Sequence, residues 1–216
     1  MDYRGIGVGE QHTVASTPGG VTLNIFKWLY YDPIWPFLFA VLLLALFPVL
    51  KIIPSSIGAG WMMVGMVLNV GYWSRAIGRF KEGCANPGII ISLSPLLIAV
   101  YTDMSKGDGD YPAVKIMKTR MPRVGKAPFQ VGMRVPTVAL YSAGMLFSGM
   151  MKPHWIDFYP VPVACGSWSD REVERVKQAI PKEEWEMLET WVKEHPQTAQ
   201  PGLYFFAAPQ AANAGE

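Results

Sequence analysis

Two apolar stretches separated by a single lysine constrain the fold of this chain more than any other feature of its sequence. No charged residue occurs between Pro33 and Leu50 or between Ile52 and Ser74, so Lys51 is the only charge in between. Charged residues make up 17% of the chain, whereas about 25% is typical of globular domains. Part of the protein surface is therefore expected not to face water.

The first stretch has the length and hydrophobicity of a membrane-spanning helix. Residues 34–53 number twenty, which as a helix covers the roughly 30 Å of bilayer hydrocarbon. Eleven Phe, Leu or Val residues within Phe37–Leu50 contribute about −3 to −7 kcal/mol to membrane insertion. The second stretch, 56–73, is diluted by glycines and by Asn69, so we expect it to depend on packing against the first.

The short connection predicts a transmembrane helical hairpin over residues 34–73, with both termini on one side of the membrane. Positive charge flanks the hairpin at Lys27, Arg75, Arg79 and Lys81, against Lys51 alone in the loop. The positive-inside rule then predicts a multi-pass protein of the bacterial inner membrane with cytosolic termini. In the alternative interpretation both stretches are core helices of a soluble protein, and the flanking charges are a coincidence.

Segment 21–33 is expected to lie at the membrane surface, after a flexible N-terminus over 1–20. Thr22–Tyr31 (TLNIFKWLYY) is predicted to form a short amphipathic helix. We expect an aromatic belt at the membrane interface on both sides of the hairpin, formed by Trp28, Tyr30, Tyr31, Trp35, Tyr72 and Trp73.

Residues 84–196 are predicted to form one cytosolic α+β domain, a small antiparallel sheet or partly open barrel closed by a C-terminal helical pair. Strands are expected over 89–101 (two short strands or one interrupted at Pro95), 111–118, 133–142 and 156–165. Ser169-Asp-Arg-Glu172 is a capping-box match that predicts a helix from Asp170, and Pro181 begins a second helix that Pro196 ends. The tail 197–216 is expected to be disordered, apart from a possible docking of 203–206.

Few residues suggest chemistry, and we predict no catalytic residue, no cofactor and no firm metal site. Asp103, Asp108 and Asp110 are weak calcium candidates, because an acidic turn explains them better than an EF-hand loop does. A thiol enzyme would need Cys165 or Cys84 to meet His154, and sequence spacing neither requires nor forbids this. The glycine-rich start, Gly5–Gly9, lacks the strand and helix of a phosphate-binding loop.

A basic segment is the best candidate for a contact surface. It carries five positive charges within twelve residues and no acid: Lys115, Lys118, Arg120, Arg123 and Lys126. Against an anionic leaflet each could add about 1 kcal/mol of attraction. The segment is predicted to contact lipid headgroups or an acidic partner, with a solvated loop as the alternative, whereas the net charge of +2 argues against nucleic acid.

Three strings resemble an uncharacterised bacterial family of small membrane proteins. They are the run Cys84–Ile116, the run His154–Trp168 (HWIDFYPVPVACGSW) and the helix Ile180–Glu189 (IPKEEWEMLE). The resemblance covers residues 25–195 and implies two transmembrane helices followed by a β-rich cytosolic domain. The family is known as a domain of unknown function, so the resemblance implies no cofactor, substrate or catalytic residue.

Three functions therefore stay open. The one favoured by a strong anchor beside a domain without convergent titratable groups is a membrane-anchored accessory protein that binds a protein partner and the bilayer. The second is a membrane-anchored hydrolase or thiol enzyme using Cys165 or Cys84 with His154. The third is a subunit of a transporter or other membrane complex.

Overall fold

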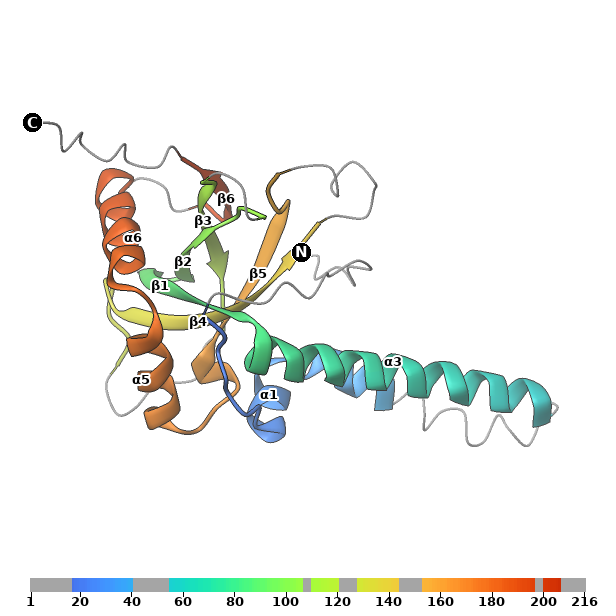
Figure 1. Cartoon of the computed structure of the whole chain (residues 1–216). Coiled ribbons are helices and arrows are strands. Elements are labelled where there is room, and N and C mark those ends of the chain that lie inside the picture. The colour runs from blue at the N-terminus through green and yellow to red at the C-terminus, as the bar shows by residue number, and fades with distance from the viewer. Residues whose placement is uncertain are drawn as a thin grey trace, which may run out of the picture.

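A curled antiparallel sheet of six strands forms the centre of the molecule (Figure 1). The computed structural model describes residues 17–40, 55–106, 110–120, 128–143, 153–196 and 200–206. The strand order is β5-β4-β1-β2-β3-β6. The strands are β1 (Cys84–Leu93), β2 (Leu96–Asp103), β3 (Pro112–Lys118), β4 (Arg134–Ser142), β5 (Asp157–Pro162) and β6 (Gly202–Phe205). The predicted α+β class with a barrel-like sheet is confirmed, in the form of a half-barrel.

β1 and β2 form a hairpin that turns at Ser94-Pro95, so the two-strand alternative for this stretch is confirmed. β1 begins at Cys84, before the predicted start at Ile89, although it contains Pro87 and lies between β4 and β2. Pro87 has no N–H to donate to the ladder. The neighbouring Asn86 amide donates to the backbone carbonyl of Tyr101 on β2 at 3.3 Å, so a side chain supplies a donor beside the proline.

The half-barrel is drawn together by contacts between strands that are distant in the sheet order. The Lys115 ammonium on β3 donates to both carboxylate oxygens of Asp157, at 2.8 and 3.0 Å, and to the backbone carbonyl of Phe158 at 2.7 Å. A backbone bridge between Ser105 and His154 lies at the same seam. Lys115 therefore joins β3 to β5.

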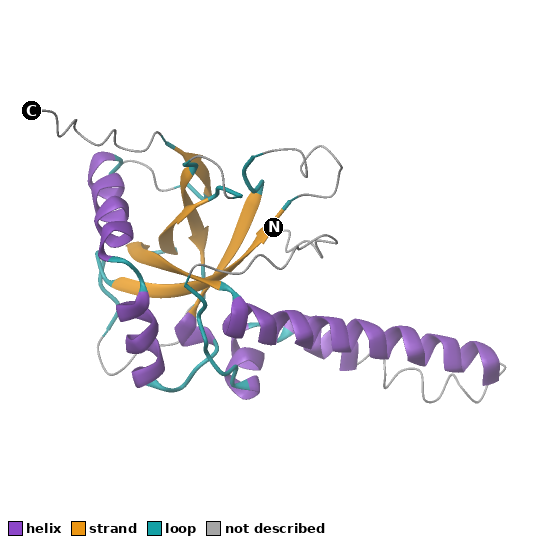
Figure 2. Ribbon diagram, viewed as in Figure 1, coloured by secondary structure: helices purple, strands orange, loops and turns teal. Residues whose placement is uncertain are grey.

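Two helices pack against the sheet, as the capping signals predict (Figure 2). α5 (Asp170–Ala179) contacts β4 and β1, and α6 (Lys182–Glu194) contacts β1 and β2. Ser169 caps α5 by accepting from the backbone N–H of Glu172, which confirms the predicted start. Trp185, Leu188 and Trp191 of α6 are buried in the core. The predicted strand over 156–165 ends at Pro162, and a 3-10 helix, η1 (Val163–Cys165), replaces its last residues.

The N-terminal part forms α1 (Ile25–Tyr31), a helical segment over 34–40, and the long helix α3 (Ser55–Glu82), which extends away from the sheet (Figure 1). The second predicted span, 56–73, lies within α3, but the helix continues nine residues further. Of the first predicted span, 34–53, residues 41–53 lie outside the described residues. Within the described ranges, no helix combines the length and the hydrophobicity needed to cross a membrane. The described helices therefore do not support the predicted transmembrane hairpin.

Residues 202–205 form strand β6, which pairs with β3. This is the docking of 203–206 that the sequence left open. This part of the tail is therefore ordered. Residues 197–199 and 207–216 lie outside the described residues, as does 144–152.

Candidate lipid-facing surface

α1 buries its charged residue together with part of its aromatic side chains, and it exposes other aromatic side chains. Lys27 is 5% exposed, whereas Phe26 is 80% and Tyr30 78% exposed. Trp28 and Tyr31, which the sequence assigned to the interfacial belt, are core residues instead, because Trp28 packs edge-on against the ring of Phe80 at 5.5 Å. An amphipathic helix in water shows the opposite arrangement. The predicted helix exists, but its outward face is apolar.

The buried Lys27 has specific partners within the domain. Its ammonium donates to the backbone carbonyl of Ser167 and lies 4.4 Å from the centroid of the Trp168 ring. Burial lowers the pKa of Lys27 below its ordinary value, opposed by Coulombic attraction to Cys165 and Asp170. Trp168 itself is 65% exposed. The lysine therefore joins α1 to the loop before α5 and supports an exposed aromatic ring.

Tyr72 of α3 connects the three N-terminal helices. Trp28 donates its indole N–H to the Tyr72 hydroxyl at 2.7 Å, and that hydroxyl donates to the Asp32 carboxylate at 3.3 Å. The ring of Phe39 lies edge-on to Tyr72 at 5.9 Å. Residues 28–39 and the second half of α3 thus lie side by side.

The part of α3 that extends from the sheet is covered by exposed apolar side chains. Seven of them, spaced over three turns of helix, are 40–68% exposed: Trp61, Met63, Val64, Met66, Val67, Leu68 and Val70. The surface continues on the shorter segment at Ile34, Phe37 and Leu38. Contiguous apolar surface of this kind marks a contact with lipid or with another protein.

The structure divides the predicted basic segment. Lys115 does not belong to it, because its ammonium is held by Asp157 inside the sheet and its side chain is only 18% exposed. Lys118 and Arg120 are exposed, and between them the Thr119 hydroxyl lies 3.4 Å from the hydroxyl of Tyr31. This contact places the backbone of residues 118–120 beside α1. Arg123 and Lys126 lie outside the described residues.

The acidic turn is organised by Asp103. Its carboxylate accepts from the backbone N–H groups of Ser105 and Tyr111, both at 2.9 Å, and from the Ser105 hydroxyl at 3.0 Å. Asp110 is exposed, and Asp108 lies outside the described residues. The described ranges contain no group of three potential metal ligands. Asp103 therefore acts as a turn cap here.

The structure does not bring His154 to a cysteine. The His154 ring lies tilted against that of Tyr111, with the centroids 4.9 Å apart, and 5.5 Å from the ring of Phe205. Its Nδ1 is 2.8 Å from the backbone carbonyl of Trp155. Cys165 is fully buried and its thiol points to the carbonyl of Arg120 at 3.9 Å. Cys84 is half-buried at the start of β1.

A buried polar cluster on three adjacent strands was not anticipated from the sequence. The hydroxyls of Tyr141 and Thr102 are 2.5 Å apart, and the Asn86 amide donates to Tyr141 at 3.3 Å. The side-chain oxygen Oδ1 of Asn86 is buried without a partner in the described structure. Burial, followed by the charge of Cys84, raises the pKa of Tyr141, so its phenol stays protonated at neutral pH. The only signal in the sequence is an alternation of polar residues along apolar strands.

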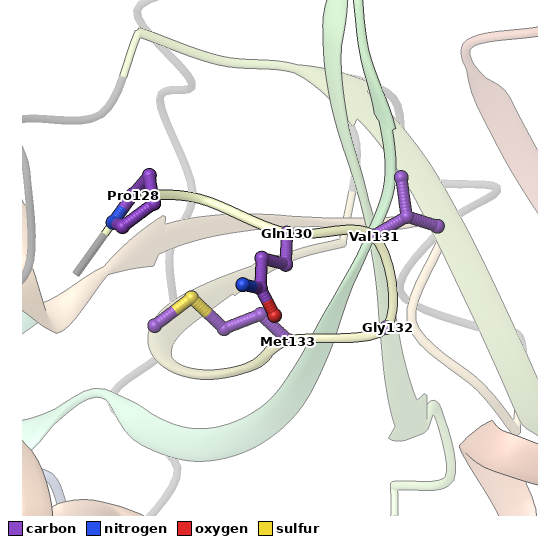
Figure 3. Close-up of a pocket in the computed structure, with 5 residues that line it drawn as sticks. All are labelled: Pro128, Gln130, Val131, Gly132 and Met133. Carbon is purple, nitrogen blue, oxygen red and sulfur yellow. The ribbon is translucent and has the colours of Figure 1, made fainter.

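Two shallow hollows lie around the turn before β4. The first, of about 310 Å³, is lined by Pro128, Gln130, Val131, Gly132 and Met133 (Figure 3). The second, of about 240 Å³, lies between β1 and α6 and shares Val131 and Gly132 with the first. Its one titratable lining residue, His195, is stacked on Trp191 at 4.7 Å. The chemistry of these linings does not identify a ligand.

Glu184 at the start of α6 provides a pH-dependent term in stability. Burial, with the charges of Asp103 and Glu183, raises its pKa from 4.5 to about 7. The folded state thus holds this proton more tightly than the unfolded state does, so its contribution to stability is lost as the pH rises from about 4.5 to about 7. The free energy of unfolding of Glu184→Gln, compared with that of the native protein, should therefore be on the order of 1–2 kcal/mol higher at pH 8 than at pH 5. This figure allows for the partial solvent exposure of the side chain.

The measurement is the free energy of unfolding in denaturant at both pH values. Glu186→Gln is the matched control, since the Glu186 side chain is 57% exposed on the same helix. An equal difference between Glu184→Gln and the native protein at the two pH values would contradict the assignment.

Comparisons with known proteins give a family and a distant structural relative. The family model described as "Protein of unknown function (DUF3239)" matches residues 73–195, from the second half of α3 to the end of α6. A crystal structure of "a putative membrane protein from Corynebacterium diphtheriae" is 19% identical, with a TM-score of 0.47. The match covers 56% of this chain and 99% of that one. Among curated proteins, none matches.

Proposed function

The chain belongs to the DUF3239 family of proteins of unknown function, and we propose that it is a membrane-anchored accessory protein whose β-rich domain binds a protein partner without chemistry of its own. In this proposal segment 34–53 and the first part of α3 form a helical hairpin in the bacterial inner membrane. The half-barrel and both termini lie at the cytosolic face.

The observation that carries the proposal is the exposed apolar surface of α3. Side chains such as Met63, Val67 and Val70 are more than 60% exposed on the part of α3 that extends from the sheet (Figure 1). No charge interrupts residues 52–74. Lipid tails would bury this apolar surface, whereas in water it would cause the protein to aggregate.

The contact between Tyr72, Trp28 and Phe39 supports the hairpin geometry. It holds residues 28 and 39 beside α3 at Tyr72, as a hairpin with both membrane ends on one side would require. Positive charge gathers on that side at Arg75, Arg79 and Lys81, which is the pattern of a cytosolic boundary.

Membrane retention of charged variants tests the anchor. We expect the native chain to stay in the membrane pellet after washing with alkaline carbonate. Val64→Arg combined with Val67→Arg should reduce this retention, because an arginine near the centre of a span costs about 2.5–3.5 kcal/mol. Ile77→Arg is the control, since Ile77 is 45% exposed on the same helix but lies beyond the predicted span.

Two results would overturn the anchor: release of the native chain by carbonate, or a monodisperse native chain in buffer without detergent. The accessory role is tested on the same variants. A partner should co-purify in fixed stoichiometry with the native chain and with Ile77→Arg from membranes dissolved in mild detergent, and should be lost with the double variant. A native chain that purifies alone would count against a partner.

A further inference from the structure

The outer face of α1 is apolar, because the only charged residue of the helix is buried. Within seven residues the helix hides Lys27, at 5% exposure, and presents Phe26 and Tyr30 at 80% and 78%. Ile25, which precedes them, is 48% exposed. Burying a lysine costs solvation free energy. Here the backbone carbonyl of Ser167 and the ring of Trp168 offset that loss by contacting the Lys27 ammonium. The apolar side chains are thereby left outside.

We infer that α1 and Trp168 lie in the headgroup region of an anionic leaflet, with Lys118 and Arg120 against the lipid phosphates. The inference rests on the membrane anchor proposed above and adds a second contact, made by the cytosolic domain itself. Phe26 and Tyr30 enter the boundary between headgroups and acyl chains, where aromatic rings are enriched in membrane proteins.

Continuity with the anchor argues for lipid at this face. α1 ends at Tyr31 and the next helical segment begins at Ile34, so two residues separate them. Along the chain the exposed apolar residues run from Phe26 and Tyr30 to Ile34, Phe37 and Leu38, and the charged residues of this segment, Lys27 and Asp32, are both buried. A bilayer around the anchor would meet α1 directly.

Charge at the rim of this face selects an anionic surface. The Thr119 hydroxyl lies 3.4 Å from that of Tyr31, and the Arg120 carbonyl accepts from the Cys165 thiol at 3.9 Å, so the backbone that carries Lys118 and Arg120 passes next to α1 and η1. Both side chains are exposed. Asp170, also exposed, lies close enough to Lys27 for its charge to act on it, and it weakens the attraction at that end. Basic residues beside an apolar face are typical of interfacial helices on anionic membranes.

Depth-dependent quenching in vesicles tests the inference. The full chain, carrying Cys84→Ser to remove its half-buried thiol, receives a fluorophore at Phe26→Cys, at Tyr30→Cys or at Val131→Cys. Val131 is the control because it is 62% exposed but lies on the turn before β4. Vesicles are made of phosphatidylcholine alone or mixed with phosphatidylglycerol, and lipids brominated high on the acyl chain act as quenchers.

We expect labels at 26 and 30 to shift to the blue and to be quenched, more strongly with phosphatidylglycerol, and the label at 131 to do neither. Lys118→Glu with Arg120→Glu should remove the dependence on phosphatidylglycerol. If the chain resists carbonate but labels 26 and 30 behave like 131, this inference is wrong and the anchor stands. Protection of both labels in detergent solution, without lipid, would show that a second protein chain covers this face instead.

Discussion

Phe80→Ala is expected to lower the free energy of unfolding by about 3–5 kcal/mol, the largest effect of any single substitution proposed for this protein. Phe80 is completely buried in the last turn of α3. Its ring meets Trp28 of α1 edge-on and packs so closely on Gly166, after η1, that a Cβ there would collide with it. Removing the ring leaves a cavity where three segments meet.

The measurement is denaturant unfolding in detergent micelles, followed by tryptophan fluorescence. Ile77→Ala is the control, because Ile77 lies one turn earlier on α3 at 45% exposure and its loss should cost less than about 1 kcal/mol. Gly166→Ala should also destabilise, since the added methyl group meets the ring from the other side. Equal costs for Phe80→Ala and Ile77→Ala would refute the role of Phe80 as the joint between helix and domain.

Lys115→Met is expected to lower the free energy of unfolding by about 2–3 kcal/mol. The substitution leaves the Asp157 carboxylate, whose side chain is 31% exposed, without its cation at the seam of the half-barrel. The Phe158 carbonyl loses a donor at the same time. Partial exposure of the pair keeps the expected cost below that of a fully buried one.

Lys118→Met is the matched control, three residues along the same segment, and should change stability by less than about 0.5 kcal/mol. The double variant Lys115→Met with Asp157→Leu should recover part of the loss, because no unpaired charge remains. Comparable effects of Lys115→Met and Lys118→Met would mean that the seam does not depend on this pair.

The sequence was most informative where the signal is local. Ser169 caps α5 as the motif predicts, and the alternating residues of 111–118 form β3 with its start displaced by one residue. Pro160 and Pro162 place β5 at the edge of the sheet, where missing donors are tolerated. These features depend on neighbouring residues, so their outcome can be derived from the chain alone.

Site residues were predicted less well, because their roles depend on distant partners. In the sequence, Lys115 looks like the other cations of its segment. In the structure it forms an ion pair with Asp157, which lies far along the chain. Trp28 and Tyr31 fitted an interfacial belt, yet both face the core. The cluster of Asn86, Thr102 and Tyr141 has no sequence motif, since its members meet only through the pairing of β4, β1 and β2.

From its sequence alone this chain was determined to be an α+β protein with two charge-free stretches, capped C-terminal helices and proline-marked strand edges. Hydrophobicity, helix capping and the missing N–H groups of proline act over a few residues, so they can be recognised in the sequence without the tertiary structure. Only the tertiary structure decided which side of α1 faces outward and which lysines are available, because the burial of a side chain depends on what packs against it from elsewhere in the chain. The outward apolar face of α1, beside Lys118 and Arg120, is the result of that packing.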